Sequence, residues 1–340
     1  LDQELEIKTA CVVNATGPWV DLTRDKMDRS PGTGKRLQLT KGVHLVFPFD
    51  KFPIKQSVYF DVPDGRMIFG IPRGKVTYVG TTDTKYTGDP KEVKTSLIDA
   101  LYLISAVNHM FPDIELELKD IQSSWAGLRP LIYEEGKTAG ELSRKDEIFE
   151  SATGLITIAG GKLTGYRKMA ERTVDLIEKK ISKYQKKSLR PIQTESIYLT
   201  EDPFESYQEV IKFIKKILPE MKTFEFDKKD VTSLVQRYGK QTESILEKFR
   251  ELTDKDPEIR LAKSELWFTL QNEMVAEPLD FFERRTGRLY FNALRIEKLI
   301  KPVLSEFAKI FKWDEDTVTK QRDILENALH EIRTKIESAV

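Results

Sequence analysis

The sequence has few residues that could crosslink or bind a metal, with one cysteine and three histidines among 340 residues. A single thiol excludes a disulfide framework, which suits the cytoplasm. Cys11 lies in the apolar run 10–13, where we expect a small buried side chain. Zinc sites need a cysteine pair or a histidine-rich cluster, so we predict no metal site.

Charge of one sign and long apolar runs are also missing. Lysine plus arginine and aspartate plus glutamate number 55 each, so no global field would attract nucleic acid, and we predict no nucleic-acid partner. No apolar run approaches the roughly 18 to 20 residues that span a bilayer, so we expect any membrane contact to be peripheral. Hydrophobic residues at 39% and charged residues at 32% are typical of an ordered globular protein.

The sequence contains neither a Gly-x-Gly-x-x-Gly nor a Gly-x-x-x-x-Gly-Lys-Ser/Thr motif, so a nucleotide cradle of either kind is incomplete here. It starts without methionine or signal peptide and leads directly into a strand pattern, so we expect it to be part of a longer protein. Single cores stop growing near roughly 250 to 300 residues, and the chain is longer than that. We therefore expect two domains.

The first 160 residues have a pattern typical of a sheet. Short runs rich in β-branched and aromatic residues predict strands at residues 9–13, 43–49, 57–62, 67–71, 76–80 and 155–159. Asp64–Gly65 and Gly74–Lys75 predict turns. Apolar residues three to four apart predict one helix over 91–110 and a second over 163–184.

The composition changes at residues 179–190, which carry six basic residues and no acidic one. We place a linker at residues 185–200, so that the domains span 1–190 and 191–340. Beyond the linker, Asp227 and Asp314 are expected helix N-caps and Gly239 an expected helix end. Apolar spacing predicts helices over 204–218, 229–238, 242–252, 263–274, 279–285, 289–311 and 315–339.

The segment from Gly154 to Arg167, a strand followed by two glycines and a helix, is the first candidate for ligand contact. Glycines let a ligand approach the backbone, and a helix N-terminus favours negative charge. Lys162 opposes that helix dipole unless an anion lies between them. The anion could be a reduced flavin, a phosphate or a carboxylate, and the alternative is a tight turn with a solvent-facing lysine.

Arg129 and His44 are the other candidates. Pro130 favours extended backbone at Arg129 and so fixes the direction of a side chain that could bind phosphate or carboxylate through two hydrogen bonds. The alternative is a surface ion pair. His44, with an ordinary pKa of about 6.5, is the best-matched general base in this composition, and the alternative is a structural histidine in a strand.

Five motifs together resemble FAD-dependent glycerol-3-phosphate dehydrogenases and the related alpha-glycerophosphate oxidases. They are residues 14–19, 41–44, 79–83, 127–131 and 160–168, and residues 280–287 resemble the C-terminal helical domain of that family. The resemblance implies an α+β or α/β fold: an incomplete glutathione-reductase-like FAD and substrate domain with a mixed sheet, followed by an all-α domain. It also implies that the dinucleotide-binding segment of the family precedes residue 1.

The resemblance implies roles for individual residues. His44, Lys162 and Arg129 match catalytic positions, and Arg129, Arg144 and His44 match positions that bind the substrate. Residues that match positions beside FAD are Ala15, Thr16, Gly17, Trp19, Gly160, Gly161, Lys162, Leu163 and Thr164.

The activity that the resemblance implies is oxidation of sn-glycerol 3-phosphate to dihydroxyacetone phosphate by hydride transfer to FAD. Quinone is the expected electron acceptor, at a cytoplasmic location peripheral to the inner face of the cell membrane. Residues 179–190 could contact anionic lipid, or they could be only a solvated linker. A homodimer also stays open.

Two alternatives stay open for the activity. The first is an oxidase that passes electrons to oxygen, although only about 28 residues separate motif 127–131 from motif 160–168, where oxidases often carry a long insertion. The second is a noncatalytic fragment that lacks FAD.

Overall fold

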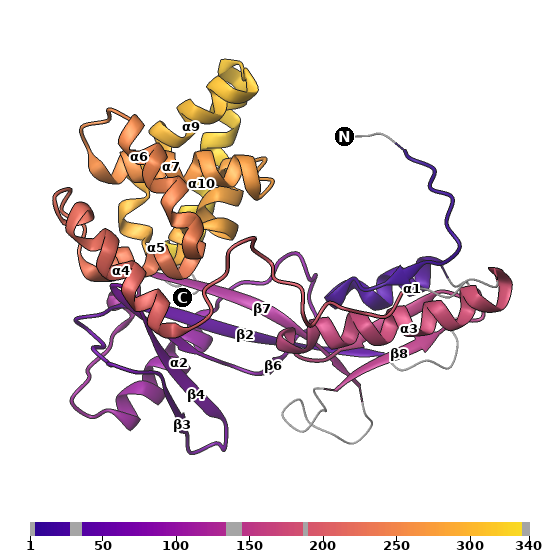
Figure 1. The fold of residues 1–340 in the computed structure, drawn as a ribbon. Coiled ribbons are helices and arrows are strands. Elements are labelled where there is room, and N and C mark those ends of the chain that lie inside the picture. Colours follow the sequence, from indigo (N-terminus) through magenta and orange to yellow (C-terminus); the bar gives the residue numbers. More distant parts are fainter. Residues whose placement is uncertain (1–3, 28–35, 134–144, 186–189, 335–340) are drawn as a thin grey trace. The chain divides into compact units, whose positions relative to one another are not determined.

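The computed structural model describes residues 4–27, 36–133, 145–185 and 190–334 (Figure 1). The chain divides into two compact units, each made of three segments. The first unit comprises Leu1–Gly42, Thr82–Lys94 and Ala126–Ile197. The second comprises Val43–Thr81, Thr95–Trp125 and Tyr198–Val340. The sequence-based division near residue 190 stays a prediction.

The first unit contains a small mixed sheet of β1 (Val13–Asn14), β9 (Ile156–Gly160) and β8 (Asp146–Glu150), in that order. β1 and β9 run parallel, whereas β8 and β9 run antiparallel. α3 (Tyr166–Gln185) follows β9 and packs along it (Figure 1). Val20, the first residue of α1 (Val20–Met27), packs with Ile132 and Ala159 in the core of this unit.

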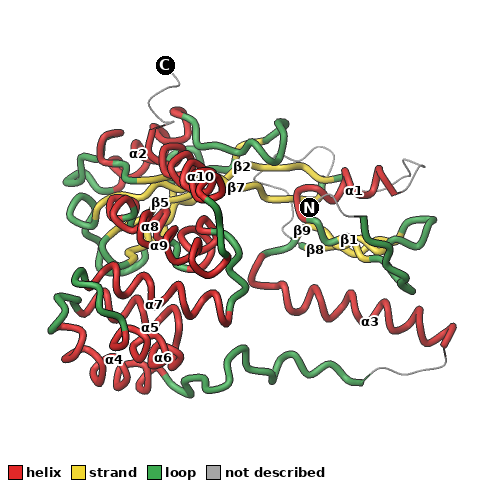
Figure 2. Tube along the Cα trace, turned by 90° about the horizontal axis from the view of Figure 1, so that it is seen from above, coloured by secondary structure: helices red, strands yellow, loops and turns green. Residues whose placement is uncertain are grey.

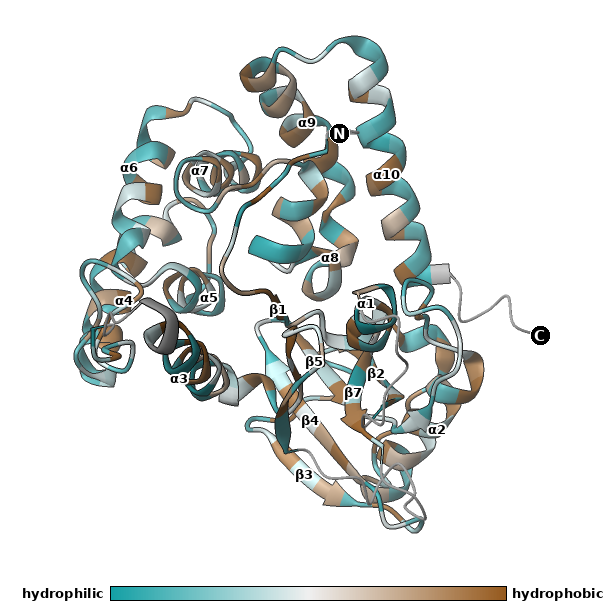
Figure 3. Cartoon of the chain, turned by 90° about the vertical axis from the view of Figure 1, so that its right-hand side faces the viewer, coloured by the Kyte–Doolittle hydropathy of each residue, from teal (hydrophilic) through white to brown (hydrophobic). Residues whose placement is uncertain are grey.

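The second unit contains an antiparallel sheet in the order β3 (Val58–Asp61), β4 (Met67–Arg73), β5 (Val76–Gly80) and β2 (Leu37–Pro48). β2 continues from the first unit, where it pairs with β6 (Thr84–Lys85), and β7 (Ser123–Ile132) also pairs with β2. Apolar residues recur along β3 and β4 (Figure 3). α2 (Leu97–Met110) contributes buried Leu103 and Val107.

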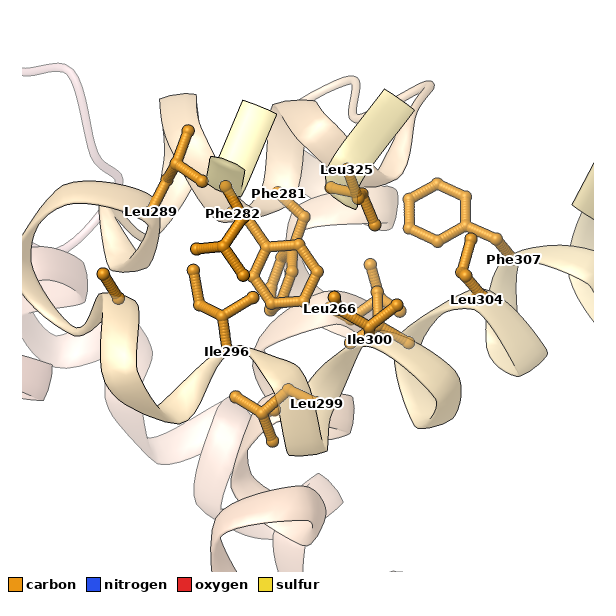
Figure 4. Close-up of a cluster of buried hydrophobic side chains, with 14 of the residues drawn as sticks. Leu266, Phe281, Phe282, Leu289, Ile296, Leu299, Ile300, Leu304, Phe307 and Leu325 are labelled. Atoms are coloured by element: carbon orange, nitrogen blue, oxygen red, sulfur yellow. The ribbon is translucent and has the colours of Figure 1, made fainter. Parts of the chain in front are cut away.

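Helices make up the rest of the second unit. α4 (Tyr207–Lys222), α5 (Lys228–Tyr238), α6 (Thr242–Glu251) and α7 (Pro257–Asn272) lie side by side (Figure 2) around buried Phe249. A second cluster, which contains Phe281, Phe282 and Phe307, forms the core between α7 and the helices that follow it (Figure 4). Those are a π-helical turn (Asp280–Arg285), α8 (Arg288–Phe291), a 3-10 turn (Ala293–Arg295), α9 (Glu297–Phe311) and α10 (Glu315–Thr334).

The predicted fold class is confirmed, because mixed sheets precede a part that is helical throughout the described residues from Tyr207 to Thr334. The hairpin turn at Asp64–Gly65 is present, with Asp61 opposite Met67. The predicted helix caps are also present. Asp227 accepts a hydrogen bond from the backbone of Asp230, Asp314 accepts one from Thr317, and Gly239 ends α5 with φ 58°.

Several predicted boundaries are wrong. The helix predicted over 91–110 begins at Leu97, because Ser96 and Asp99 form a capping box there. The helix predicted over 263–274 begins at Pro257, behind the N-cap Asp256. The helix predicted over 289–311 breaks at Asn292, whose φ of −148° and ψ of 35° are not helical. This break lets Leu289, Ala293 and Ile296 enter one core cluster.

The sheet also differs from the expectation. The strand predicted over 9–13 is reduced to Val13–Asn14, since only these residues pair with β9. Cys11 is only half-buried, not buried. No strand was predicted at β8, which pairs with β9 over its whole length. Among the described helices, none is both long and apolar enough to cross a bilayer.

Candidate active site

The turn between β9 and α3 requires its two glycines for reasons of backbone geometry. Gly160 and Gly161 have φ of 77° and 82°, which side chains rarely adopt. A Cβ at Gly160 would lie 2.5 Å from the carbonyl oxygen of Lys145, and one at Gly161 would lie 2.9 Å from Met169 Sδ. The glycines are therefore needed for packing within the protein, independently of any ligand.

Lys162 directly follows this turn, and two exposed apolar side chains, Leu163 and Tyr166, come shortly after it. Its carbonyl accepts a hydrogen bond from the amide of Gly165 at 2.8 Å, which closes a 3-10 turn before α3. The Lys162 and Thr164 side chains are exposed. Leu163 is 89% exposed and Tyr166 is 60% exposed, which is unusual for residues of this size. Exposed apolar side chains beside a pocket are typical of a binding surface.

A pocket of about 850 Å³ opens beside the turn within the first unit. Its volume is in the range of small-molecule sites, roughly 300 to 1,000 Å³. Both predicted cations, Arg129 and Lys162, line it. The remaining lining is largely apolar and includes Val13, Ala15, Leu128, Pro130, Leu131, Ile158, Leu163, Tyr166, Met169, Val174 and Ile177. An apolar slot with two cations suits a flat ring or a small molecule that carries negative charge.

Arg129 is held where three of the sequence motifs meet. Its Nη1 donates to the carbonyl oxygen of Thr82 at 3.1 Å and lies 3.4 Å from Asp83 Oδ1. A Cβ at Gly42 would lie 2.6 Å from Nη1, so the guanidinium needs a glycine beneath it. Thr82 Oγ1 in turn donates to the carbonyl of Lys41 at 3.2 Å. Arg129 does form an ion pair, yet only 23% of its side chain is exposed and it lines the pocket.

His44 belongs to the second unit, where neighbouring rings fix its orientation. Its imidazole stacks on Trp125 with ring centroids 4.7 Å apart and an interplanar angle of 13°. A Cβ at Gly80, its partner across β2 and β5, would lie 2.8 Å from His44 Nε2. Phe69 lies 5.5 Å from the imidazole, centroid to centroid. Sequence reasoning missed Trp125, although it lies only two positions before the 127–131 motif.

The motif at residues 14–19 forms a tight connection from β1 to α1. The Asn14 side chain is buried, donates to the carbonyl of Val20 at 3.0 Å and accepts from Thr16 Oγ1 at 2.8 Å. Gly17, with φ of 57°, begins the 3-10 turn that includes Trp19. Within this motif Ala15 lines the pocket.

The predicted site is thus brought together in part. Arg129, Lys162, Ala15 and Leu163 share the first unit's pocket, to which Gly160 and Gly161 also contribute. Arg144 lies outside the described residues. Among the residues that are described, no group of histidine, cysteine, aspartate and glutamate could hold a metal ion. The roles assigned to individual residues stay predictions.

Comparison with known proteins identifies the class first. Residues 2–167 match the family model described as FAD dependent oxidoreductase. Residues 205–318 match the model described as the C-terminal domain of alpha-glycerophosphate oxidase. The sheet-containing part of the chain is thus similar to FAD-dependent oxidoreductases, and the helical part is similar to a domain that follows the FAD-binding part in one such oxidase.

Individual relatives give a more specific similarity. The chain is 42% identical to the aerobic glycerol-3-phosphate dehydrogenase of Bacillus subtilis strain 168, covering 98% of this chain and 60% of the relative. It is 39% identical to the enzyme of the same name from Staphylococcus aureus strain USA300, covering 97% and 59%. Over nearly its whole length, the chain is therefore similar to proteins named aerobic glycerol-3-phosphate dehydrogenase.

A solved structure shows the same similarity. The glycerol-3-phosphate dehydrogenase from Bacillus halodurans complexed with FAD matches with a TM-score of 0.81 and 42% identity. The match covers 96% of this chain and 63% of that structure. The chain therefore spans about three fifths of the length of the relatives that it matches.

Proposed function

We propose that the whole protein to which this chain belongs oxidises sn-glycerol 3-phosphate to dihydroxyacetone phosphate with FAD and passes the electrons to membrane quinone. The observation that carries the proposal is that Arg129 and Lys162, from separate motifs, line one pocket. The names of the similar proteins supply the substrate class, and they describe dehydrogenases, not oxidases. Quinone as the acceptor is part of the proposal.

The pocket of the first unit fits a flavin ring. Its walls are apolar, its volume is about 850 Å³, and Leu163 and Tyr166 expose apolar surface beside it. Ala15 and residues 160–163, which line the pocket, would hold the ring. Bound FAD would supply the hydride acceptor. Lys162 would stabilise negative charge that develops in the pocket during the reaction.

Arg129 would bind the phosphate group of the substrate. Thr82 and Asp83 hold the guanidinium through Nη1, so the side chain is positioned before the substrate arrives. A planar guanidinium matches phosphate with two parallel hydrogen bonds. Binding energy from this non-reacting group would then fix the position of the reacting carbon.

His44 would accept the proton of the C2 hydroxyl group. An arginine rarely gives up its proton, because its pKa lies far above neutral pH, whereas a histidine titrates near neutral pH. Stacking on Trp125 restricts the imidazole to one orientation, as a general base requires.

Rapid-reaction measurements on the intact enzyme test these assignments. We expect His44→Asn to slow flavin reduction by substrate roughly 100-fold or more, the usual contribution of a general base. An unchanged rate would contradict the assignment of the base. Arg129→Ala should raise KM for glycerol 3-phosphate steeply and barely alter weak turnover of glycerol. Equal effects on both substrates would remove the phosphate role.

Oxygen as acceptor is the second candidate, since the model that matches residues 205–318 is described from an oxidase. The short separation of motif 127–131 from motif 160–168 favours the dehydrogenase. Measurement of oxygen uptake without quinone distinguishes them, because only the oxidase would sustain turnover.

Quinone use also leads us to propose a peripheral position on the inner face of the cell membrane. Cosedimentation with anionic and neutral liposomes at two salt concentrations tests this location. Binding that depended on neither lipid charge nor salt would exclude an electrostatic role for residues 179–190.

A further inference from the structure

A second and larger pocket, of about 1,280 Å³, lies within the second unit. The β4–β5 turn, α5, α7 and the segment around α8 contribute its walls. Two arginines of this lining, Arg237 and Arg288, bind the carboxylate of Glu265, and a third, Arg73, lies beside Gly287, the residue before Arg288. We call the part of the pocket that is lined by Arg73, Arg237, Arg288 and Glu265 the arginine pocket.

Glu265 anchors two of the three arginines. Its side chain is fully buried, and its Oε1 accepts hydrogen bonds from Arg237 Nη1 at 2.7 Å and from the Tyr238 hydroxyl at 3.1 Å. Its Oε2 accepts from Arg288 Nη2. Arg288 is itself only 9% exposed, and its Nη1 has no hydrogen-bond partner among the described residues. The carboxylate of Glu265 thus binds two guanidinium groups, and Nη1 of Arg288 donates no hydrogen bond within the described residues.

Arg73 adds a third positive charge. Its Cζ lies 3.8 Å from the ring centroid of Phe291, and its Nη2 would lie 3.7 Å from a Cβ at Gly287, the residue before Arg288. No ion pair joins Arg73 to a carboxylate of the described residues. Partial burial lowers the pKa of Arg73, and the neighbouring charge of Arg237 lowers it further. A guanidinium stacked on a ring keeps its N–H edge available for an anion.

Other charged groups in this pocket compensate one another. Most of its remaining cations form ion pairs: Arg284 with Asp280 and Glu283, Arg285 with Glu273, Arg295 with Glu258, Lys298 with Asp256 and Glu258, and Lys75 with Asp227 and Asp230. Exposed Lys229 and Glu225 carry opposite charges. Glu297, which also lines the pocket, pairs with Arg333 outside it. The uncompensated positive charge of the lining therefore lies with Arg73, Arg237 and Arg288.

We propose that the arginine pocket binds a small phosphomonoester, with Arg73 as the principal contact to its phosphate group. Guanidinium forks match the oxygens of phosphate, and Glu265 compensates only one of the charges of Arg237, Arg288 and the nearby Arg73, which leaves charge for a dianion to neutralise. The pocket continues past the arginines to Phe224, Phe226 and Leu294, which could contact the organic part of a phosphomonoester. This site is separate from the pocket of Arg129, which belongs to the first unit.

Isothermal titration of the chain with inorganic phosphate tests the site. We expect Arg73→Gln to weaken binding at this site roughly tenfold or more, as loss of a charge-assisted contact does. Arg66→Gln is the matched control, because Arg66 also stacks on a ring, 3.9 Å from the centroid of Tyr102. Arg66 pairs with Asp64 and does not line the arginine pocket, so its loss should leave phosphate binding unchanged.

Two further arms separate this proposal from the proposed enzymatic activity. Arg129→Gln should leave phosphate binding at the arginine pocket intact, whatever it does to turnover. Succinate should bind at least tenfold more weakly than phosphate if the site selects phosphate. The proposal is overturned if Arg73→Gln binds phosphate like the unaltered chain, if Arg129→Gln abolishes all phosphate binding, or if succinate binds equally well.

Discussion

Replacement of Glu265 by glutamine should cost the second unit much of its stability. The substitution preserves volume but removes the charge that compensates Arg237 and Arg288. Breaking a buried ion pair on one side costs about 3 to 5 kcal/mol. We expect about 3 kcal/mol, the lower end of that range, because the Arg237 side chain is 26% exposed and can recover contact with water.

Urea unfolding measures this loss as a decrease in the free energy of unfolding. Tryptophan fluorescence is a suitable signal because Trp267 lies on α7 with Glu265. The matched control is Glu220→Gln, which breaks a bidentate pair with Arg250 at 2.8 and 2.7 Å on the surface. Exposed pairs contribute about 0 to 1 kcal/mol. Equal losses in the two variants, or a loss below that of the control, would refute the reasoning.

Three further predictions concern pH and the glycines. Burial would raise the pKa of Glu265, but its arginine partners outweigh burial and lower it. The stabilisation by ionised Glu265 should therefore be complete above pH 4.5, the ordinary pKa of a glutamate, and should be lost as pH falls through the lowered pKa. The free energy of unfolding of Glu265→Gln should depend less on pH below 4.5 than that of the unaltered chain. Gly160→Ala should destabilise the first unit more than Gly154→Ala in urea unfolding, since both have positive φ but only Gly160 also meets a carbonyl oxygen. The Gly154 change should cost about 1 to 2 kcal/mol, and equal costs would exclude the clash. Gly42→Ala should displace the Arg129 guanidinium and raise KM for glycerol 3-phosphate about tenfold with a smaller change in kcat; an unaltered KM would exclude that role.

Local signals were sufficient for most of the fold. Runs of β-branched residues located β3, β4 and β5, and Asp64–Gly65 located the hairpin between the first two. Asp227, Asp314 and Gly239 mark helix ends by their own chemistry. These features depend on neighbours in the sequence, which is why pattern reasoning finds them.

Features that depend on distant residues were missed. β8 has little strand signal of its own and is defined by its pairing with β9. The break at Asn292 follows from packing of Leu289 and Ile296 into one cluster, which no local spacing reveals. The arginine pocket draws on β4, α5, α7 and α8, whose residues are far apart in the sequence.

Only part of the site was predicted, because some of its contacts join residues that are far apart in the sequence. The glycine-lysine turn and Arg129 were recognised as separate motifs, and the structure places them in one pocket. The structure adds a reason for Gly160 that the pattern does not show, since a Cβ there would lie 2.5 Å from the carbonyl oxygen of Lys145. No sequence signal showed that Thr82 and Gly42 hold the Arg129 guanidinium.

The stack of His44 on Trp125 above Gly80 has an evolutionary consequence. The three residues pack against one another, so a side chain at position 80 would displace the imidazole of His44. A smaller residue at position 125 would remove the ring on which the imidazole stacks. Selection should therefore act on the trio as a unit. Across relatives, substitutions at 44, 80 and 125 should occur together or hardly at all, whereas an exposed residue of the same sheet, such as Tyr59, should vary independently.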